Sequence, residues 1–119
     1  MSDVESPRRV DKPWGHELIW AATEHYVGKV LVVRAGHALS LQYHERKDET
    51  LYLVRGELRF HVGPSADQLE EVAFPAGTSY RIVPGTLHRM EAITDVELLE
   101  ASTPELDDVV RVEDRYGRA

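Results

Sequence analysis

The feature that most constrains the fold of this chain is a succession of short apolar segments separated by turn residues. The turns are rich in glycine, proline and aspartate, as in Pro75-Ala76-Gly77 and Pro84-Gly85. Many short strands punctuated in this way are typical of an antiparallel sandwich or barrel. We therefore predict an all-β chain with strands at residues 17–20, 29–34, 38–44, 49–55, 57–62, 68–74, 79–83, 88–92, 97–101 and 109–112.

The domain organisation follows from length and local composition. Residues 1–9 are polar and show no periodicity, so we predict a mobile N-terminal arm. Residues 10–119 are expected to form one domain, because a chain of 119 residues leaves little room for a second core. The one helical turn we expect lies at residues 103–108, where Pro104 suits the first helical position.

Charge and composition exclude several classes of partner. The formal net charge is −7, from 21 acidic and 14 basic residues, and the bases are scattered along the chain. An acidic chain without a basic cluster is a poor binder of nucleic acid. There is neither a signal peptide nor an apolar run of about 18 residues, so we expect a cytoplasmic protein with no membrane partner.

Two strands carry apolar side chains on both faces, which predicts that something covers each face. In residues 49–54, Tyr52 and Val54 lie opposite the face that carries Glu49. The N-terminal segment at residues 14–20 could cover this face, and a second subunit could do so as well. We therefore predict a homodimer.

Four side chains with nitrogen or oxygen donors are expected to converge. Gln42 and His44 are two residues apart on one strand, so they point to the same face. A hairpin turn then brings Glu49 across from them. His88 begins a later strand after a proline–glycine turn that can direct it into the same cavity. The sequence has no cysteine, so any metal must be held by nitrogen and oxygen donors.

This donor set suits one divalent transition metal. Two imidazoles, one carboxylate and one amide carbonyl are ligands for Zn, Mn, Fe, Co or Ni. Because one ligand is anionic, the site keeps a net positive charge and can polarise a carbonyl or acidify a bound water. Open coordination positions would take a small-molecule ligand.

The same residues resemble the two motifs of the cupin family. The first motif is carried by Gly36, His44, Glu49 and Gly56, with Gln42 in place of the usual first histidine, and the second by Gly77 with PGTLH at residues 84–88. The chain is most similar to cupin-type mannose-6-phosphate isomerases, including the C-terminal domain of mannose-1-phosphate guanylyltransferase/isomerases. That similarity rests on KPWGHE (12–17), LSLQYH (39–44), PGTLHRM (84–90) and DDVVRVEDRYGR (107–118).

The resemblance implies a cupin β-barrel, also called a double-stranded β-helix or jelly roll. It also implies a metal at Gln42, His44, Glu49 and His88, and sugar-phosphate chemistry. The chain departs from the isomerase motif at three places: Arg46 and Thr50 replace histidines, and Lys47 replaces an arginine. The two lost histidines are candidate acid–base groups.

Three functions remain open. A metal-dependent isomerase needs an electrophile and a base; the candidate catalytic residues are Glu49 and Lys47, with Lys47 or a metal-bound hydroxide as the base. An iron-dependent small-molecule dioxygenase could use two histidines and a carboxylate. A carbohydrate-binding module would bind without turnover. Candidate substrate contacts are Arg34, Arg81 and Arg89 as phosphate clamps, and Tyr43 and Tyr52, each of which could instead be a solvated or packing residue.

Overall fold

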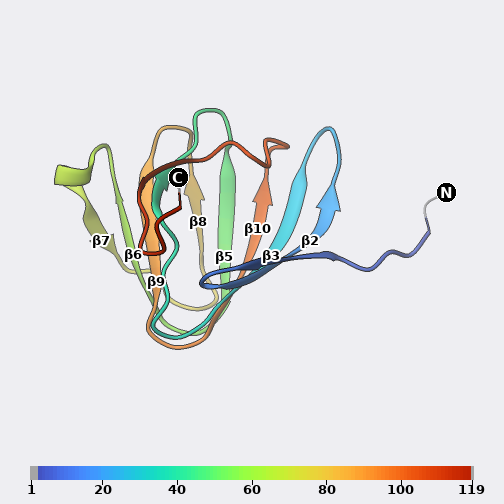
Figure 1. Ribbon diagram of the computed structural model, residues 1–119, viewed down its shortest axis with the longest axis horizontal. Helices are drawn as coiled ribbons and strands as arrows, with labels where there is room; N and C mark the ends of the chain where they lie inside the picture. The colour runs from blue at the N-terminus through green and yellow to red at the C-terminus, as the bar shows by residue number, and fades with distance from the viewer. Residues whose placement is uncertain (1–2, 119) are drawn as a thin grey trace.

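Strand pairing produces two antiparallel sheets that face one another (Figure 1), seen in a computed structural model that describes residues 3–118. Apart from one short 3-10 helix, η1 (Ala66–Gln68), the regular elements of the described residues are strands, so the all-β prediction is confirmed. The larger sheet contains, in spatial order, β1 (Arg8–Lys12), β2 (Gly15–Ala22), β3 (Val27–Val33), β10 (Val96–Ser102), β5 (Glu49–Arg55) and β8 (Ser79–Ile82). The smaller contains β11 (Val110–Glu113), β4 (Leu41–Tyr43), β9 (Leu87–Ala92), β6 (Leu58–Gly63) and β7 (Glu70–Val72).

The core lies between the inner faces of the two sheets. Strand alternation directs Leu51 and Leu53 of β5 inward, where both are fully buried. Phe60 of β6 meets them from the other sheet and packs edge-on against the rings of Phe74 and Tyr80, with centroids 5.3 and 4.9 Å away. One continuous apolar cluster therefore joins the sheets.

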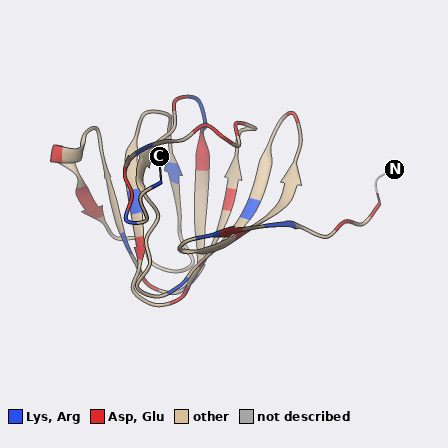
Figure 2. Ribbon diagram, in the orientation of Figure 1, with Lys and Arg blue, Asp and Glu red and all other residues tan. Residues whose placement is uncertain are grey.

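The inner face of the larger sheet changes character along its strands. At one end it carries charged side chains: Lys29 on β3, Glu100 on β10 and Glu49 on β5. Figure 2 marks these basic and acidic positions on the three strands. Lys29 lies directly opposite Glu100 in the strand register, so their side chains are neighbours. This polar end of the sheet forms the wall of the site described below.

Three local predictions need correction. Arg8 and Arg9 belong to β1, so the predicted arm of residues 1–9 is too long. The helical turn at residues 103–108 is absent, because the backbone there binds other segments: the Thr103 amide donates to the Asp48 carbonyl at 3.0 Å. The strand predicted at 38–44 is reduced to β4, preceded by an isolated bridge at Ala38.

The outer face of the larger sheet exposes several apolar side chains. Leu99 of β10 lies opposite Tyr52 of β5, and both are exposed. Trp20 covers Gly28, where an added Cβ would lie 2.6 Å from the indole ring. Trp14 instead joins the core, so the N-terminal segment covers only part of this face. A second subunit here stays a prediction. Within residues 3–118, no helix has the length and hydropathy to cross a membrane.

Candidate metal centre and its pocket

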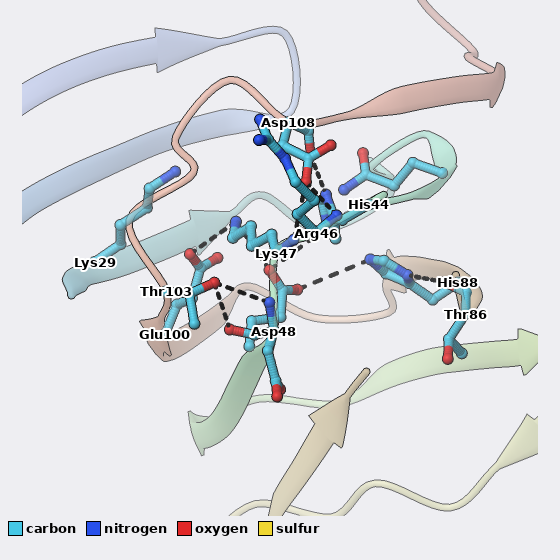
Figure 3. Close-up of polar contacts among 12 residues, drawn as sticks. Lys29, His44, Arg46, Lys47, Asp48, Thr86, His88, Glu100, Thr103 and Asp108 are labelled. Carbon is cyan, nitrogen blue, oxygen red and sulfur yellow. Dashed lines mark hydrogen bonds and ion pairs between the residues drawn. The ribbon is translucent and has the colours of Figure 1, made fainter. Parts of the chain in front are cut away.

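Three donors from separate parts of the chain meet at the polar end of the molecule. His44 follows β4 and His88 lies on β9 (Figure 3). Glu49 begins β5. All three are buried, and one ligand atom from each lies within 4.8 Å of the others. Gln42 is directly opposite His88 in the register and lines the same pocket. Its Oε1 accepts a hydrogen bond from Ser40 Oγ at 2.6 Å, which leaves a second lone pair on that oxygen.

The hydrogen bonds of the two histidines define their tautomers. His44 Nδ1 donates to the Asp108 carbonyl oxygen at 2.5 Å, and His88 Nδ1 donates to the Thr86 carbonyl oxygen at 2.9 Å. A carbonyl oxygen cannot donate, so each Nδ1 carries a proton, and Nε2 is the ring atom that faces Glu49. His44 Nε2 lies 3.5 Å from Glu49 Oε2, and His88 Nε2 lies 3.9 Å from Glu49 Oε1.

This arrangement fits a bound cation. Two imidazole Nε2 atoms face a carboxylate, and His44 Nε2 has no hydrogen-bond partner within the described part of the chain. A metal ion among these atoms would give His44 Nε2 the partner that it lacks. Neutral imidazoles oriented by carbonyl acceptors are typical of protein metal sites. The three donors could therefore hold a metal ion.

Burial sets the protonation of the donors. Desolvation lowers the pKa of His88 to about 4, so its imidazole is neutral at neutral pH. Desolvation raises the pKa of Glu49, and the charge of Glu100 adds to this effect while Lys47 opposes it. A neutral His88 is ready to coordinate without first losing a proton.

Lys47 is buried between two carboxylates. Its Nζ lies 2.9 Å from Glu49 Oε2 and 3.0 Å from Glu100 Oε2. Burial alone would lower the pKa of Lys47, but Glu100 and Glu49 outweigh it and raise that pKa above its ordinary value. Lys47 therefore stays protonated, which does not fit the role of general base expected for it.

The pocket around these donors has a volume of about 190 Å³. Its walls come from both ends of the chain as well as from the larger sheet. Lys29 on that sheet approaches Glu17 at 3.4 Å. Basic residues line several sides of the cavity: Arg8, Lys12, Lys29, Lys47, Arg111 and Arg118.

The predicted substrate contacts lie elsewhere, and none of the five lines the pocket. Arg34 donates to the Pro13 carbonyl oxygen at 3.1 Å, and Arg81 binds Asp48 at 2.6 Å. Arg89 approaches Glu113 at 3.9 Å, Tyr43 is half-buried on β4 and Tyr52 is 42% exposed on the outer face. Strand alternation explains the outward direction of Tyr52 and Arg81, because their inward neighbours are Leu51 and Ile82.

Sequence reasoning missed several residues of the pocket. Lys29 shares its strand face with Leu31 and Val33, and Glu100 shares its face with Leu98. A charged residue in an otherwise apolar row is a signal that could have identified both. Strand β1, which places Arg8 and Lys12 at the pocket, gave no such signal because its inward row is mostly charged.

Comparison with known proteins identifies relatives of the chain. Residues 1–114 match the family described as Mannose-6-phosphate isomerase C-terminal. Mannose-1-phosphate guanylyltransferase ManC of Salmonella typhimurium is 34% identical over 115 residues, which are 93% of this chain and 23% of that protein. Xanthan biosynthesis protein XanB of Xanthomonas campestris is 31% identical over 124 residues, 98% of this chain and 25% of that protein. The chain thus spans about a quarter of the length of these relatives.

Solved structures share the fold at low identity. Capsular polysaccharide assembling protein CapF of Staphylococcus aureus superposes with a TM-score of 0.74 at 16% identity, over 93% of this chain and 33% of that one. Oxalate decarboxylase of Bacillus subtilis superposes with a TM-score of 0.74 at 18% identity, over 91% of this chain and 30% of that one. KdgF of Halomonas sp. superposes with a TM-score of 0.68 at 19% identity, over 84% of this chain and 88% of that one. The chain has the cupin fold and belongs to the mannose-6-phosphate isomerase C-terminal family.

Proposed function

We propose that this cupin domain holds one divalent metal at His44, Glu49 and His88, with Gln42 beside it, and binds a sugar phosphate in the adjoining pocket. The observation that carries the proposal is the convergence of two histidine Nε2 atoms on one buried carboxylate. The metal, when bound, would act as a Lewis acid on a ligand oxygen. The Bacillus subtilis oxalate decarboxylase of the same fold is described as having Mn(II) centers.

The charge of the pocket supports an anionic ligand. Acidic residues outnumber basic ones in the whole chain, 21 to 14, whereas six basic and five acidic residues line this cavity. Arg8 and Lys12 reach it from β1, and Arg111 reaches it from β11. Arginine is well suited to phosphate because its planar donors can bind two oxygens at once. The relative ManC is named for mannose 1-phosphate and the family for mannose 6-phosphate, which supports a sugar phosphate.

The state of Lys47 favours binding without turnover as a second candidate function. An aldose–ketose isomerase needs a base beside the reacting carbon. Lys47 is protonated and held by Glu49 and Glu100, while Glu49 and the two histidines would be occupied by metal. The residues that hold the metal are therefore not also free to carry a substrate proton. Dioxygenase chemistry remains an alternative, because two histidines and a carboxylate are also the ligands of many iron(II) oxygenases.

The binding proposal can be tested by calorimetric titration of the Mn- or Zn-loaded protein with mannose 6-phosphate and with mannose. We expect the phosphate ester to bind and the neutral sugar to bind at least tenfold more weakly. Arg8→Ala should weaken phosphate binding about tenfold, about 1.4 kcal/mol. Arg9→Ala is the matched control, because Arg9 pairs with Asp11 and does not line the pocket. Equal affinity for ester and sugar would overturn the anionic-ligand assignment.

Turnover is measured on the same samples. Interconversion of mannose 6-phosphate and its ketose isomer would establish an isomerase, and binding without interconversion would establish a binding module. Oxygen uptake by the iron(II)-loaded protein with the same compounds would instead establish an oxygenase.

A further inference from the structure

One residue of the C-terminal segment binds three consecutive amides of the loop that follows His44. The Asp108 carboxylate accepts the backbone N–H groups of Glu45, Arg46 and Lys47 at 3.1, 2.7 and 2.9 Å. Its backbone carbonyl oxygen accepts the Nδ1 proton of His44 (Figure 3). Four consecutive residues therefore hydrogen-bond to a single residue that lies 64 positions after His44.

These contacts act on the connection between two of the donors. Residues 44–48 join β4 to β5, so they set the position of Glu49 relative to His44. Backbone N–H groups in such a connection lack ladder partners, and an aspartate that accepts three of them fixes the loop in one conformation. The carbonyl contact fixes the ring orientation and tautomer of His44.

We propose that Asp108 is a positioning residue of the metal centre, which holds the His44–Glu49 loop in the geometry that binds the ion. The inference rests on the metal site of the proposed function. Leu106, Asp107 and Val109 line the pocket beside it, so the same short segment connects the donors to the ligand cavity. By thermodynamic linkage, metal binding must stabilise the Asp108 contacts as much as those contacts favour the metal.

The rest of the C-terminal segment is anchored independently of Asp108. Tyr116 Oη lies 2.7 Å from His37 Nδ1, and Arg115 donates to the Gly36 carbonyl oxygen at 2.9 Å. Asp114 pairs with Arg118 at 3.0 Å. Loss of the Asp108 carboxylate should therefore leave the segment docked, so an effect on the metal can be separated from loss of the fold.

The test compares Asp108→Asn and Asp108→Ala with Asp95→Asn. Asp95 is a matched control, because its carboxylate accepts the Ala35 N–H at 2.8 Å and does not line the pocket. Zinc affinity is measured by competition with a chromophoric chelator, and circular dichroism checks folding. We expect affinity to fall about 10- to 100-fold for Asp108→Ala, less for Asp108→Asn, and within twofold of wild type for Asp95→Asn. The visible spectrum of the cobalt(II)-loaded protein should change only in the Asp108 variants.

Hydrogen exchange gives an independent measurement. Metal loading should slow exchange of the amides at residues 45–47 in the wild type and not in Asp108→Ala. A folded Asp108→Ala or Asp108→Asn protein with wild-type zinc affinity would overturn the inference while leaving the metal site intact. If Asp108→Ala fails to fold, Asp108→Asn decides alone. A wild-type protein that binds no zinc, manganese or iron would overturn the metal centre itself.

Discussion

The two ends of the space between the sheets are equally buried but chemically opposite. On β5, Glu49 faces the pocket whereas Leu53, on the same strand face, lies in the apolar core. On β9, His88 is a buried polar residue of the site, whereas Met90, on the same strand face, belongs to the apolar core. Burying the apolar side chains stabilises the fold, whereas burying the polar ones costs free energy unless partners compensate them. One end of the molecule therefore holds the structure together, and the other uses part of that stability to assemble a site.

The largest effect should come from the apolar end. Phe60→Ala removes a fully buried ring that contacts Phe74 and Tyr80. We expect the free energy of unfolding to fall by about 3–5 kcal/mol, measured by urea denaturation monitored by circular dichroism. A loss below about 1 kcal/mol would show that this end is not the main source of stability.

The polar end should respond to removal of its internal cation. Lys47→Met leaves Glu49 and Glu100 buried without the ammonium between them. We expect the metal-free protein to lose about 3 kcal/mol, and added zinc or manganese to restore part of the loss. Lys12→Met, which removes a more exposed contact to Glu17 at 3.8 Å, should cost less than about 1 kcal/mol. Equal losses in the two variants would contradict the comparison.

Acid should destabilise the polar end through His88. The pKa of His88 is about 4 in the folded protein against an ordinary value of 6.5. Between these values the unfolded chain binds a proton that the folded chain does not, so stability is lost as pH falls from above 6.5 toward 4. The loss from this group is about 3 kcal/mol at pH 4. Urea denaturation of metal-free protein at several pH values should show a shallower pH dependence for His88→Gln than for the wild type. Parallel curves would contradict the assignment.

The smallest effect should come from the exposed surface. Arg81 forms an exposed pair with Asp48. Arg81→Ala should lower the free energy of unfolding by less than about 1 kcal/mol, and it should leave sugar-phosphate affinity unchanged. A calorimetric loss of binding in this variant would return Arg81 to the list of phosphate contacts.

Much of the fold and the convergence of the donors could be predicted because both rest on local patterns. The two-residue period places Gln42 and His44 on one face, and the turn before β5 returns Glu49 to it. The strand prediction at residues 49–55 matches β5. These features depend on nearby residues, so the sequence contains them directly.

The pocket walls could not be predicted in the same way. Arg34, Arg81 and Arg89 were chosen by charge alone, but none of them lines the cavity. Arg81 and Arg89 point to the other face of their strands, and Arg34 follows β3 and binds the Pro13 carbonyl oxygen. The role of Asp108 was not predicted, because its partners lie in a loop more than 60 positions earlier. Which distant segments meet is decided by sheet topology, which local periodicity does not specify.

The strand register has a consequence for how the protein folds. Residue 29 lies beside residue 100, so a very long loop closes before that pairing contributes any stability. Refolding should accordingly be slow, on the scale of milliseconds to seconds. The donors belong to segments that meet only after this closure. A metal ion would therefore bind to them late in folding, and its main kinetic effect would be to slow the unfolding of the protein.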